Sequence, residues 1–301
     1  MNGDSVAKPG APTGSVYDLS YKRYTGGRRS PAWRIGVIAR YALVAQWKRR
    51  GVKVALGLGG LLLAGFSVFA GAKWAATRAF QAQGAGALVA ELSNPNHDVA
   101  LMALRAQWLP TVFLVMFAGA GAIANDLKAG AFQFHFARPV QVGHYLVGRL
   151  LGAVGWASLL SLVTLTLLAA LRVATGGDVA GVLGAFAAGC VGVLLRLLAL
   201  AGVALGASSM TRRQGLAQTV YLGLVGGTTI VATGLSDARD GAVWNALSVV
   251  GASTSATATL LGTSGLEGVA RLAPFGSSLA WGAAGLLLAW RRLRGAEVMR
   301  G

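Results

Sequence analysis

Six apolar runs of about 20 residues each constrain the fold of this chain more than any other feature of its sequence. A helix of that length crosses the hydrocarbon core of a bilayer, so each run is a candidate transmembrane helix. Charged residues make up only 12% of the chain, about half their share in soluble domains. We therefore predict an all-α, polytopic membrane protein and exclude a soluble enzyme, a disordered tail and a secreted disulfide scaffold. The expected spans are 52–72, 107–125, 146–171, 180–209, 215–235 and 273–290.

The basic residues predict how these spans are oriented, because cytosolic loops of membrane proteins carry an excess of Lys and Arg. With both termini in the cytosol, 20 of the 27 Lys and Arg residues lie in or beside cytosolic segments, and 6 lie in external segments. The remaining one, Arg196, lies inside the fourth span. We therefore attribute the net charge of +17 to membrane topology rather than to nucleic-acid binding.

The spans are expected to form one domain, 51–291, which follows two other segments. A polar cytosolic arm over 1–30 leads into an amphipathic helix over 31–50, and a basic cytosolic tail covers 292–301. Aromatic residues recur among basic residues on the amphipathic helix, which is typical of a helix lying in the membrane interface. These aromatic residues are Trp33, Tyr41 and Trp47. A helix that simply faces water is the alternative.

Two external segments, 73–106 and 236–272, are long, and the sequence leaves their structure open. The first could continue the first span as a helix past Lys73. The second is rich in Ser, Thr, Gly and Ala and could dip partly into the membrane.

Glycine is abundant, with 44 residues, and several glycines are four residues apart. In lipid, this spacing lets two helix backbones approach closely. A chance distribution in a chain rich in Gly and Ala is the alternative. The pairs are Gly148/Gly152, Gly202/Gly206 and Gly223/Gly227.

The connection between the second and third spans carries the most informative pattern. Asp126 ends the second span, and Phe132 and Phe136 follow at i, i+4 spacing, where they can form one apolar pair. Pro139 disfavours helical geometry at Arg138, which predicts a bent element instead of one straight helix. Exposed aromatic residues on a basic loop favour docking into another protein's groove, and burial in the membrane interface is the alternative.

This connection resembles that of the membrane subunits of ABC-2-type transporters. In that family the second span ends near an Asp, a Gly-containing stretch leads to an Arg-Pro pair, and a Tyr-Leu-x-Gly-Arg/Lys motif begins the third span. The matching residues here are Asp126, Gly130, Arg138-Pro139 and Tyr145-Leu146-Val147-Gly148-Arg149. The segment 17–28 is similar to the lead-in of some bacterial members, and the six-span plan matches too. The third to sixth spans carry no residue signature of the family.

The resemblance implies the permease subunit of an ATP-binding-cassette exporter in a bacterial inner membrane. Two six-span subunits, identical or different, would pair, and each would dock on a separate P-loop ATPase. The chain contains no G-x-x-x-x-G-K-[ST] motif, so ATP and Mg²⁺ are expected on that partner, and we expect this chain to be no enzyme and to hold no cofactor. The ATPase-coupling loop would comprise Asp126, Lys128, Phe132, Phe136, Arg138, Pro139, Tyr145 and Arg149.

Other functions stay open. A related complex could transmit force or signal to envelope partners without moving cargo, and a channel or scaffold would need no ATPase. An intramembrane protease is disfavoured, because Ser264 needs a general base and no His falls inside a span. Metal binding is disfavoured as well, because three scattered His and the single Cys190 show no ligand spacing.

Arg196 is the one formal charge deep inside a predicted span. Such charges are costly and usually face the bundle interior or a water-filled cavity. Contact with an anionic ligand or with another helix is the functional interpretation, and a misplaced span is the alternative. The composition of the spans does not distinguish between classes of transported cargo, because spans rich in Gly, Ala, Leu and Val suit a lipid, a drug or an apolar peptide equally.

Overall fold

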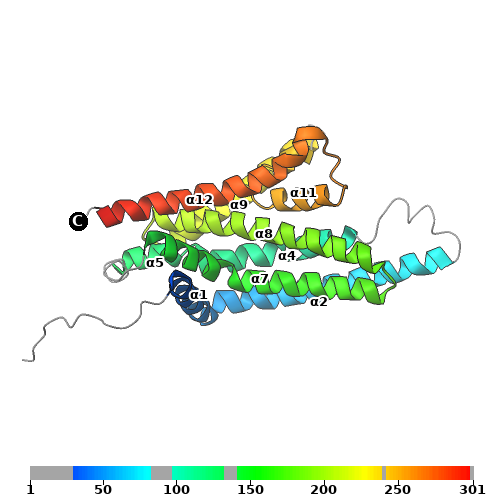
Figure 1. Ribbon diagram of the computed structural model, residues 1–301, viewed down its shortest axis with the longest axis horizontal. Coiled ribbons are helices and arrows are strands. Elements are labelled where there is room, and N and C mark those ends of the chain that lie inside the picture. The colour runs from blue at the N-terminus through cyan, green and yellow to red at the C-terminus, as the bar shows by residue number, and fades with distance from the viewer. Residues whose placement is uncertain (1–29, 83–96, 132–140, 239–241, 299–301) are drawn as a thin grey trace, which may run out of the picture. The chain divides into compact units, whose positions relative to one another are not determined.

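A computed structural model describes residues 30–82, 97–131, 141–238 and 242–298 (Figure 1). The helical domain begins at Pro31. Its elements are α1 (Pro31–Trp47), α2 (Arg50–Ala82), α4 (His97–Gly119), α5 (Ala122–Lys128), α7 (Val142–Ala174), α8 (Val179–Met210), α9 (Gln214–Ala238), α10 (Ala242–Asn245), α11 (Gly251–Leu260), the 3-10 helix η1 (Gly268–Leu272) and α12 (Ala273–Val298).

Every regular element in the described ranges is a helix, and six helical stretches are long and apolar enough to cross a membrane. The predicted all-α fold with six spans is therefore confirmed, and the chain is a polytopic helical membrane protein. The stretches are Arg50–Phe80, His97–Lys128, Val142–Ala174, Val179–Met210, Gln214–Ser236 and Gly268–Gly295. They extend beyond the predicted apolar runs, because a helix continues through polar turns that hydropathy alone does not detect.

The far part of α2 shows this extension most clearly. The helix has 33 residues, which corresponds to about 50 Å and exceeds the thickness of a bilayer core. It continues past Lys73, whose ammonium group pairs with the carboxylate of Asp98 at the start of α4. Beside this pair, Trp74 is fully buried, and the Arg172 guanidinium of α7 lies 5.7 Å from its ring centroid. The first segment that the sequence left open is therefore helical as far as Ala82.

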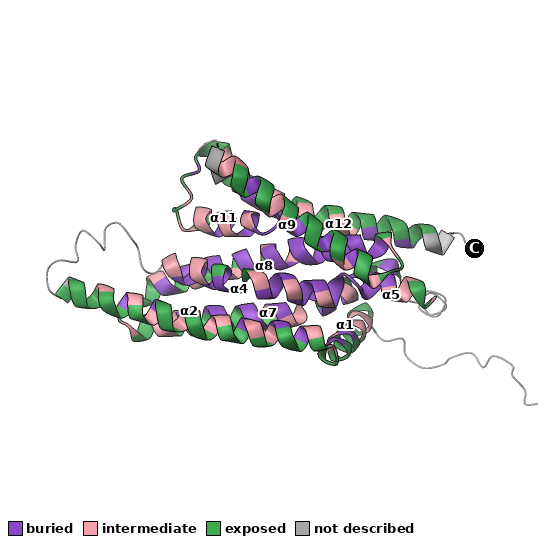
Figure 2. Ribbon diagram, turned by 180° about the vertical axis from the view of Figure 1, so that it is seen from behind, coloured by how far each residue is buried: buried purple, intermediate pink, exposed green. Residues whose placement is uncertain are grey.

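The interior of the domain lies around α4 and α8, which are largely buried, whereas α2, α9 and α12 have few buried residues (Figure 2). α8 packs against α4, α7, α9, α11 and α12. Large apolar side chains such as Leu61, Val68 and Ile230 point outward from the outer helices. In a membrane protein these residues suit contact with lipid tails, so exposed apolar surface needs no other explanation.

Glycines bring α8 and α12 into backbone contact. A Cβ atom at Gly202 would overlap the carbonyl oxygen of Gly282, and one at Gly206 would lie 2.9 Å from the Cα of Gly285. Neither position leaves room for a side chain. The close approach predicted for the Gly202/Gly206 pair is therefore confirmed.

The other two glycine pairs differ from each other. On α7, a Cβ at Gly148 would lie 2.7 Å from the Cβ of Ile38, and one at Gly152 would lie 2.6 Å from the Cβ of Ala42, so this pair lets α1 approach α7. On α9, Gly223 and Gly227 have no neighbour within 4 Å of an added Cβ. That third pair mediates no helix contact within the described chain.

The second segment that the sequence left open folds back beside the long helices (Figure 1). α11 has ten residues, about 15 Å, which is too short to span a bilayer. It packs against α4, α8 and α12 and buries Ser253 and Thr257. It ends at Leu260. Gly262, two residues later, has a φ of +72°, and the Thr263 N–H donates to the Ala258 carbonyl oxygen at 2.9 Å. Only glycine adopts that left-handed backbone readily, so Gly262 stops the helix.

Candidate functional site

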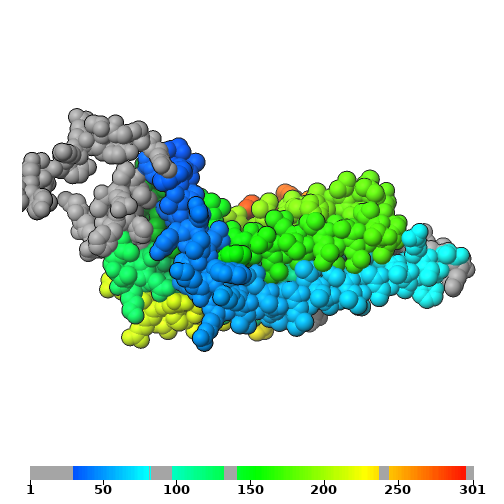
Figure 3. Space-filling model, turned by 90° about the horizontal axis from the view of Figure 1, so that it is seen from below, coloured from blue at the N-terminus to red at the C-terminus, as the bar shows by residue number. Residues whose placement is uncertain are grey.

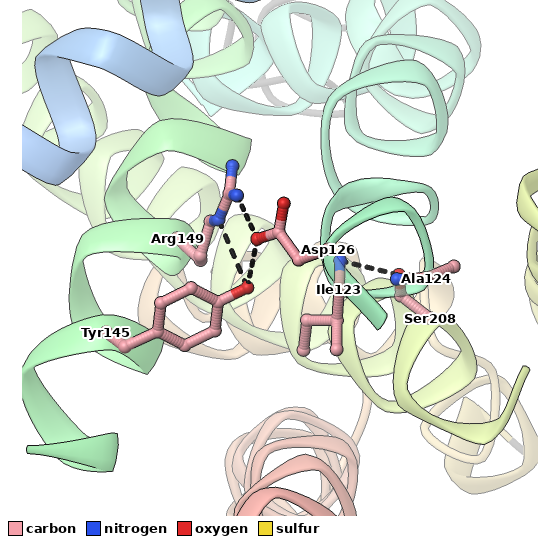
Figure 4. Close-up of polar contacts among 6 residues, drawn as sticks. All are labelled: Ile123, Ala124, Asp126, Tyr145, Arg149 and Ser208. Atoms are coloured by element: carbon pink, nitrogen blue, oxygen red, sulfur yellow. Dashed lines mark hydrogen bonds and ion pairs between the residues drawn. The ribbon is translucent and has the colours of Figure 1, made fainter. Parts of the chain in front are cut away.

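A break between α4 and α5 begins the site predicted from the sequence. α4 ends at Gly119 and α5 starts at Ala122, so the first N–H groups of α5 lack partners in their own helix. The hydroxyl oxygen of Ser208, a fully buried residue of α8, accepts the N–H groups of Ile123 at 3.0 Å and Ala124 at 2.9 Å (Figure 4). One side chain of α8 therefore holds the start of α5.

Asp126, Tyr145 and Arg149 form a polar cluster that joins α5 to α7 (Figure 4). The Tyr145 hydroxyl donates to Asp126 Oδ2 at 2.5 Å, and the Arg149 guanidinium forms an ion pair with the same oxygen. Arg149 Nε also donates to the Tyr145 hydroxyl oxygen at 3.3 Å. The Tyr145 side chain is fully buried, and the side chains of Arg149 and Asp126 are only 18% and 17% exposed. These three residues, predicted from the sequence, are therefore brought together.

α5 is also bonded to the start of α9. Asn125 Nδ2 donates to Gln214 Oε1 at 3.1 Å. A Cβ at Gly121 would lie 2.7 Å from Gln214 Cγ, so the absent side chain lets Gln214 lie against the helix break. Through Ser208, the Asp126 cluster and Gln214, α5 is held by α8, α7 and α9 together.

The connection between α1 and α2 reaches the same break. Arg49 Nη1 donates at 2.7 Å to the carbonyl oxygen of Phe117, in the last turn of α4. Carbonyls in a last helical turn lack intrahelical donors, so Arg49 supplies one. Burial, and to a smaller extent the neighbouring positive charge of Arg149, lower the pKa of Arg49. We name α5 together with the residues that bond it or the end of α4 the α5 junction. These residues are Arg49, Tyr145, Arg149, Ser208 and Gln214.

α1 leaves its aromatic side chains at least partly exposed. Tyr41 is 76% exposed, and Trp33 and Trp47 are about half exposed, while the side of α1 that packs on α7 buries Ala39, Ala42 and Gln46. Figure 3 shows α1 running across the direction of α2. Trp47 also stacks on Trp156 of α7, with the ring centroids 4.9 Å apart. The placement of α1 in a membrane interface stays a prediction that this geometry suits.

The remaining residues predicted for the coupling loop are not part of the Asp126 cluster as the structure describes it. Lys128 is exposed at the end of α5, and among the described residues Asp126 pairs with Arg149 and not with Lys128. Phe132, Phe136, Arg138 and Pro139 lie outside the described residues. The structure describes the positions on either side of them, α5 and the start of α7, which the Asp126 cluster ties together.

Arg196 lies near the middle of α8 and is only 2% exposed. Its Nε donates to Ser253 Oγ at 3.1 Å, and its Nη2 donates to Thr254 Oγ1 at 2.8 Å. Its Nη1 donates to the carbonyl oxygen of Leu104 in α4. Arg196 therefore joins α8 to α4 and α11, so it makes a contact between helices, which is one of the interpretations that the sequence left open.

Sequence reasoning missed five side-chain partners at these two sites. Ser208, Gln214 and Arg49 bond the α5 junction, and Ser253 and Thr254 bond Arg196. Ser208 is a polar residue at the end of an apolar run, which is a usable signal. The others lie 57 or more residues from the groups they bind, and nothing in their local sequence indicates those partners.

No protein family model matches this sequence, and no curated protein matches it.

Proposed function

We propose that this chain is the permease subunit of an ATP-binding-cassette exporter, coupled to a separate cytosolic P-loop ATPase. In this proposal the chain lies in a bacterial inner membrane, both termini are cytosolic, and a second permease copy or paralogue completes the substrate pathway. ATP and Mg²⁺ are held by the partner ATPase, and this chain performs no hydrolysis itself.

The observation that carries the proposal is the bonding of the α5 junction. α5 immediately precedes the basic, Phe-containing segment 132–140, and its own side chains or backbone are bonded to α7, α8 and α9. A force applied to that segment would therefore reach three long helices through specific hydrogen bonds and an ion pair. A channel or scaffold that works without an ATPase does not require such a connection.

The break between α4 and α5 supports the same interpretation. A continuous helix through residues 97–128 would move as one rod, whereas a break with externally bonded ends lets α5 change its angle. Ser208 and Arg49 bond three of the backbone groups that the break leaves without intrahelical partners, and these bonds stabilise the break. A break between two helices whose ends are hydrogen-bonded to neighbouring elements can act as a hinge. Such a hinge suits an element that converts closure of the ATPase into movement of the transmembrane helices.

The test is affinity purification of the tagged full chain from native membranes in mild detergent, followed by mass spectrometry. We expect a P-loop ATPase in near-stoichiometric amount. Replacing Phe132 and Phe136 by Ala together with Arg138→Glu should reduce the recovered ATPase strongly. The matched control is Arg292→Glu, an exposed charge on α12 beyond the last apolar run, which should leave the recovery unchanged.

Three results would contradict the proposal or one part of it. A preparation that contains only this chain would favour the channel or scaffold. Unchanged ATPase recovery by the triple variant would refute the role given to the segment 132–140. ATPase recovery with additional envelope proteins and no cargo flux would replace export by transmission of force or signal.

A further inference from the structure

The buried guanidinium of Arg196 is balanced by neutral groups alone. Its hydrogen bonds go to the hydroxyls of Ser253 and Thr254 and to the Leu104 carbonyl, and no carboxylate of the described residues lies within ion-pair distance of it. Three described carboxylates interact with other groups: Asp98 pairs with Lys73, Asp126 pairs with Arg149, and Asp178 accepts the Gly181 N–H. A guanidinium also has more N–H donors than these three bonds use. A buried positive charge with spare donors is poorly satisfied until an anion binds it.

A cavity of about 510 Å³ opens beside this guanidinium. That volume lies within the range of about 300–1,000 Å³ typical of sites for small molecules. Arg105 of α4 contributes a second positive charge to the lining, and no Asp or Glu of the described residues lines it. The cavity is therefore electrostatically suited to an anion and unsuited to a cation.

The lining divides into a polar part and an apolar part. Hydroxyl groups of α11, those of Thr254 and Ser255, can donate hydrogen bonds to an oxyanion. The first turn of α11 also lines the cavity, and the N-terminal end of a helix carries partial positive charge. Leu101, Trp108 and other apolar residues form the rest of the wall, where a hydrocarbon chain would fit better than a fully polar solute.

We propose that this cavity is a binding site for an amphiphile that carries a carboxylate or phosphate group, with the oxyanion held by Arg196 and the apolar chain along Leu101 and Trp108. The site itself requires no ATPase, but its use as the substrate site of an exporter rests on the proposed function. A purely structural role, in which Arg196 only fastens α11 to α4 and α8, is the competing explanation.

The experiment measures binding of radiolabelled dodecyl phosphate to the purified full chain in phosphatidylcholine nanodiscs, without any ATPase. Unlabelled dodecanoate, dodecyl maltoside and inorganic phosphate serve as competitors. Arg196→Gln removes the charge, and Ala258→Phe fills the cavity from α11 without altering Arg196. Thr166→Val on the exposed side of α7 is the control variant. The melting temperature of each variant, measured in the same nanodiscs, reports whether it is folded.

We expect saturable binding that dodecanoate displaces and the neutral dodecyl maltoside does not. Arg196→Gln should weaken binding about tenfold or more, because a charged hydrogen bond is lost in a buried site. Ala258→Phe should weaken it comparably while its melting temperature stays near that of the wild type. If nanodiscs that contain phosphatidylglycerol lower the binding, the natural ligand is a bilayer lipid; if they do not, it is a separate amphiphile.

The contrary results are equally specific. Unchanged binding by Ala258→Phe would show that the ligand does not enter the cavity. This result would refute the proposal even if Arg196→Gln were unfolded and its loss of binding therefore uninformative. Displacement by inorganic phosphate at the same concentration would refute the amphiphile, and displacement by dodecyl maltoside would refute the anion. Because the assay contains no ATPase, loss of this site leaves the permease proposal standing, and the absence of an ATPase partner leaves this site standing.

Discussion

Replacing Asp126 by Asn tests the central link of the α5 junction. The substitution keeps the size of the side chain and an oxygen that can accept from Tyr145, but it removes the charge that pairs with Arg149. Arg149 would then be a largely buried cation without its carboxylate. α5 would keep its bonds to Ser208 and Gln214, so the perturbation is confined to the connection with α7.

The magnitude follows from the burial of the pair. Exposed ion pairs contribute about 0–1 kcal/mol, whereas removing one partner of a fully buried pair costs about 3–5 kcal/mol. The two side chains here are 18% and 17% exposed, between these limits but nearer the buried one. We therefore expect Asp126→Asn to lower the free energy of unfolding by about 2–3 kcal/mol.

The assay is reversible unfolding in mixed micelles of dodecyl maltoside and sodium dodecyl sulfate, extended to a double-mutant cycle with Arg149→Gln. The double variant should lose less stability than the sum of the single variants, with a coupling of about 1–2 kcal/mol. Asp98→Asn is the matched control, because its partner Lys73 is 36% exposed and the expected loss is below about 1 kcal/mol. Additive single effects, or an equal loss for Asp98→Asn, would refute the reasoning.

Two further predictions concern packing inside the domain. Ser208→Ala removes the acceptor of two buried N–H groups and should lower the free energy of unfolding by about 2 kcal/mol, whereas Ser158→Ala, whose hydroxyl bonds only its own helix, should be nearly neutral in the same micelle assay. An equal effect of the two substitutions would contradict the role of Ser208. Gly202→Ala should cost about 1–3 kcal/mol, because the methyl group meets the backbone of Gly282, which cannot move aside cheaply. Gly223→Ala has open space around it and should not destabilise the protein; if it destabilises as much as Gly202→Ala, steric contact is not the cause.

The sequence alone allowed part of the α5 junction to be predicted. Asp126, Tyr145 and Arg149 are 23 residues apart at most, and their motif lies at the ends of two adjacent apolar runs, so their closeness follows from a short connection between antiparallel helices. Ser208 and Arg49 could not be assigned in this way. Their partners lie 85 and 68 residues away, and only the packing of α8 and of the α1–α2 connection brings them to the break.

Hydropathy by itself determined that the chain is a polytopic helical membrane protein with six spans, because any backbone that crosses lipid must satisfy its own hydrogen bonds and a helix does so locally. It also singled out Arg196 as a charge inside a span. Only the tertiary structure decided that Arg196 bonds α4 and α11 beside a cavity, that α11 folds back among the long helices, and that Gly202 lies against α12 while an added Cβ at Gly223 would meet no described residue. The physical reason is that helix formation depends on neighbours a few residues apart, whereas these contacts depend on which helix faces meet, and apolar runs of similar composition do not specify that.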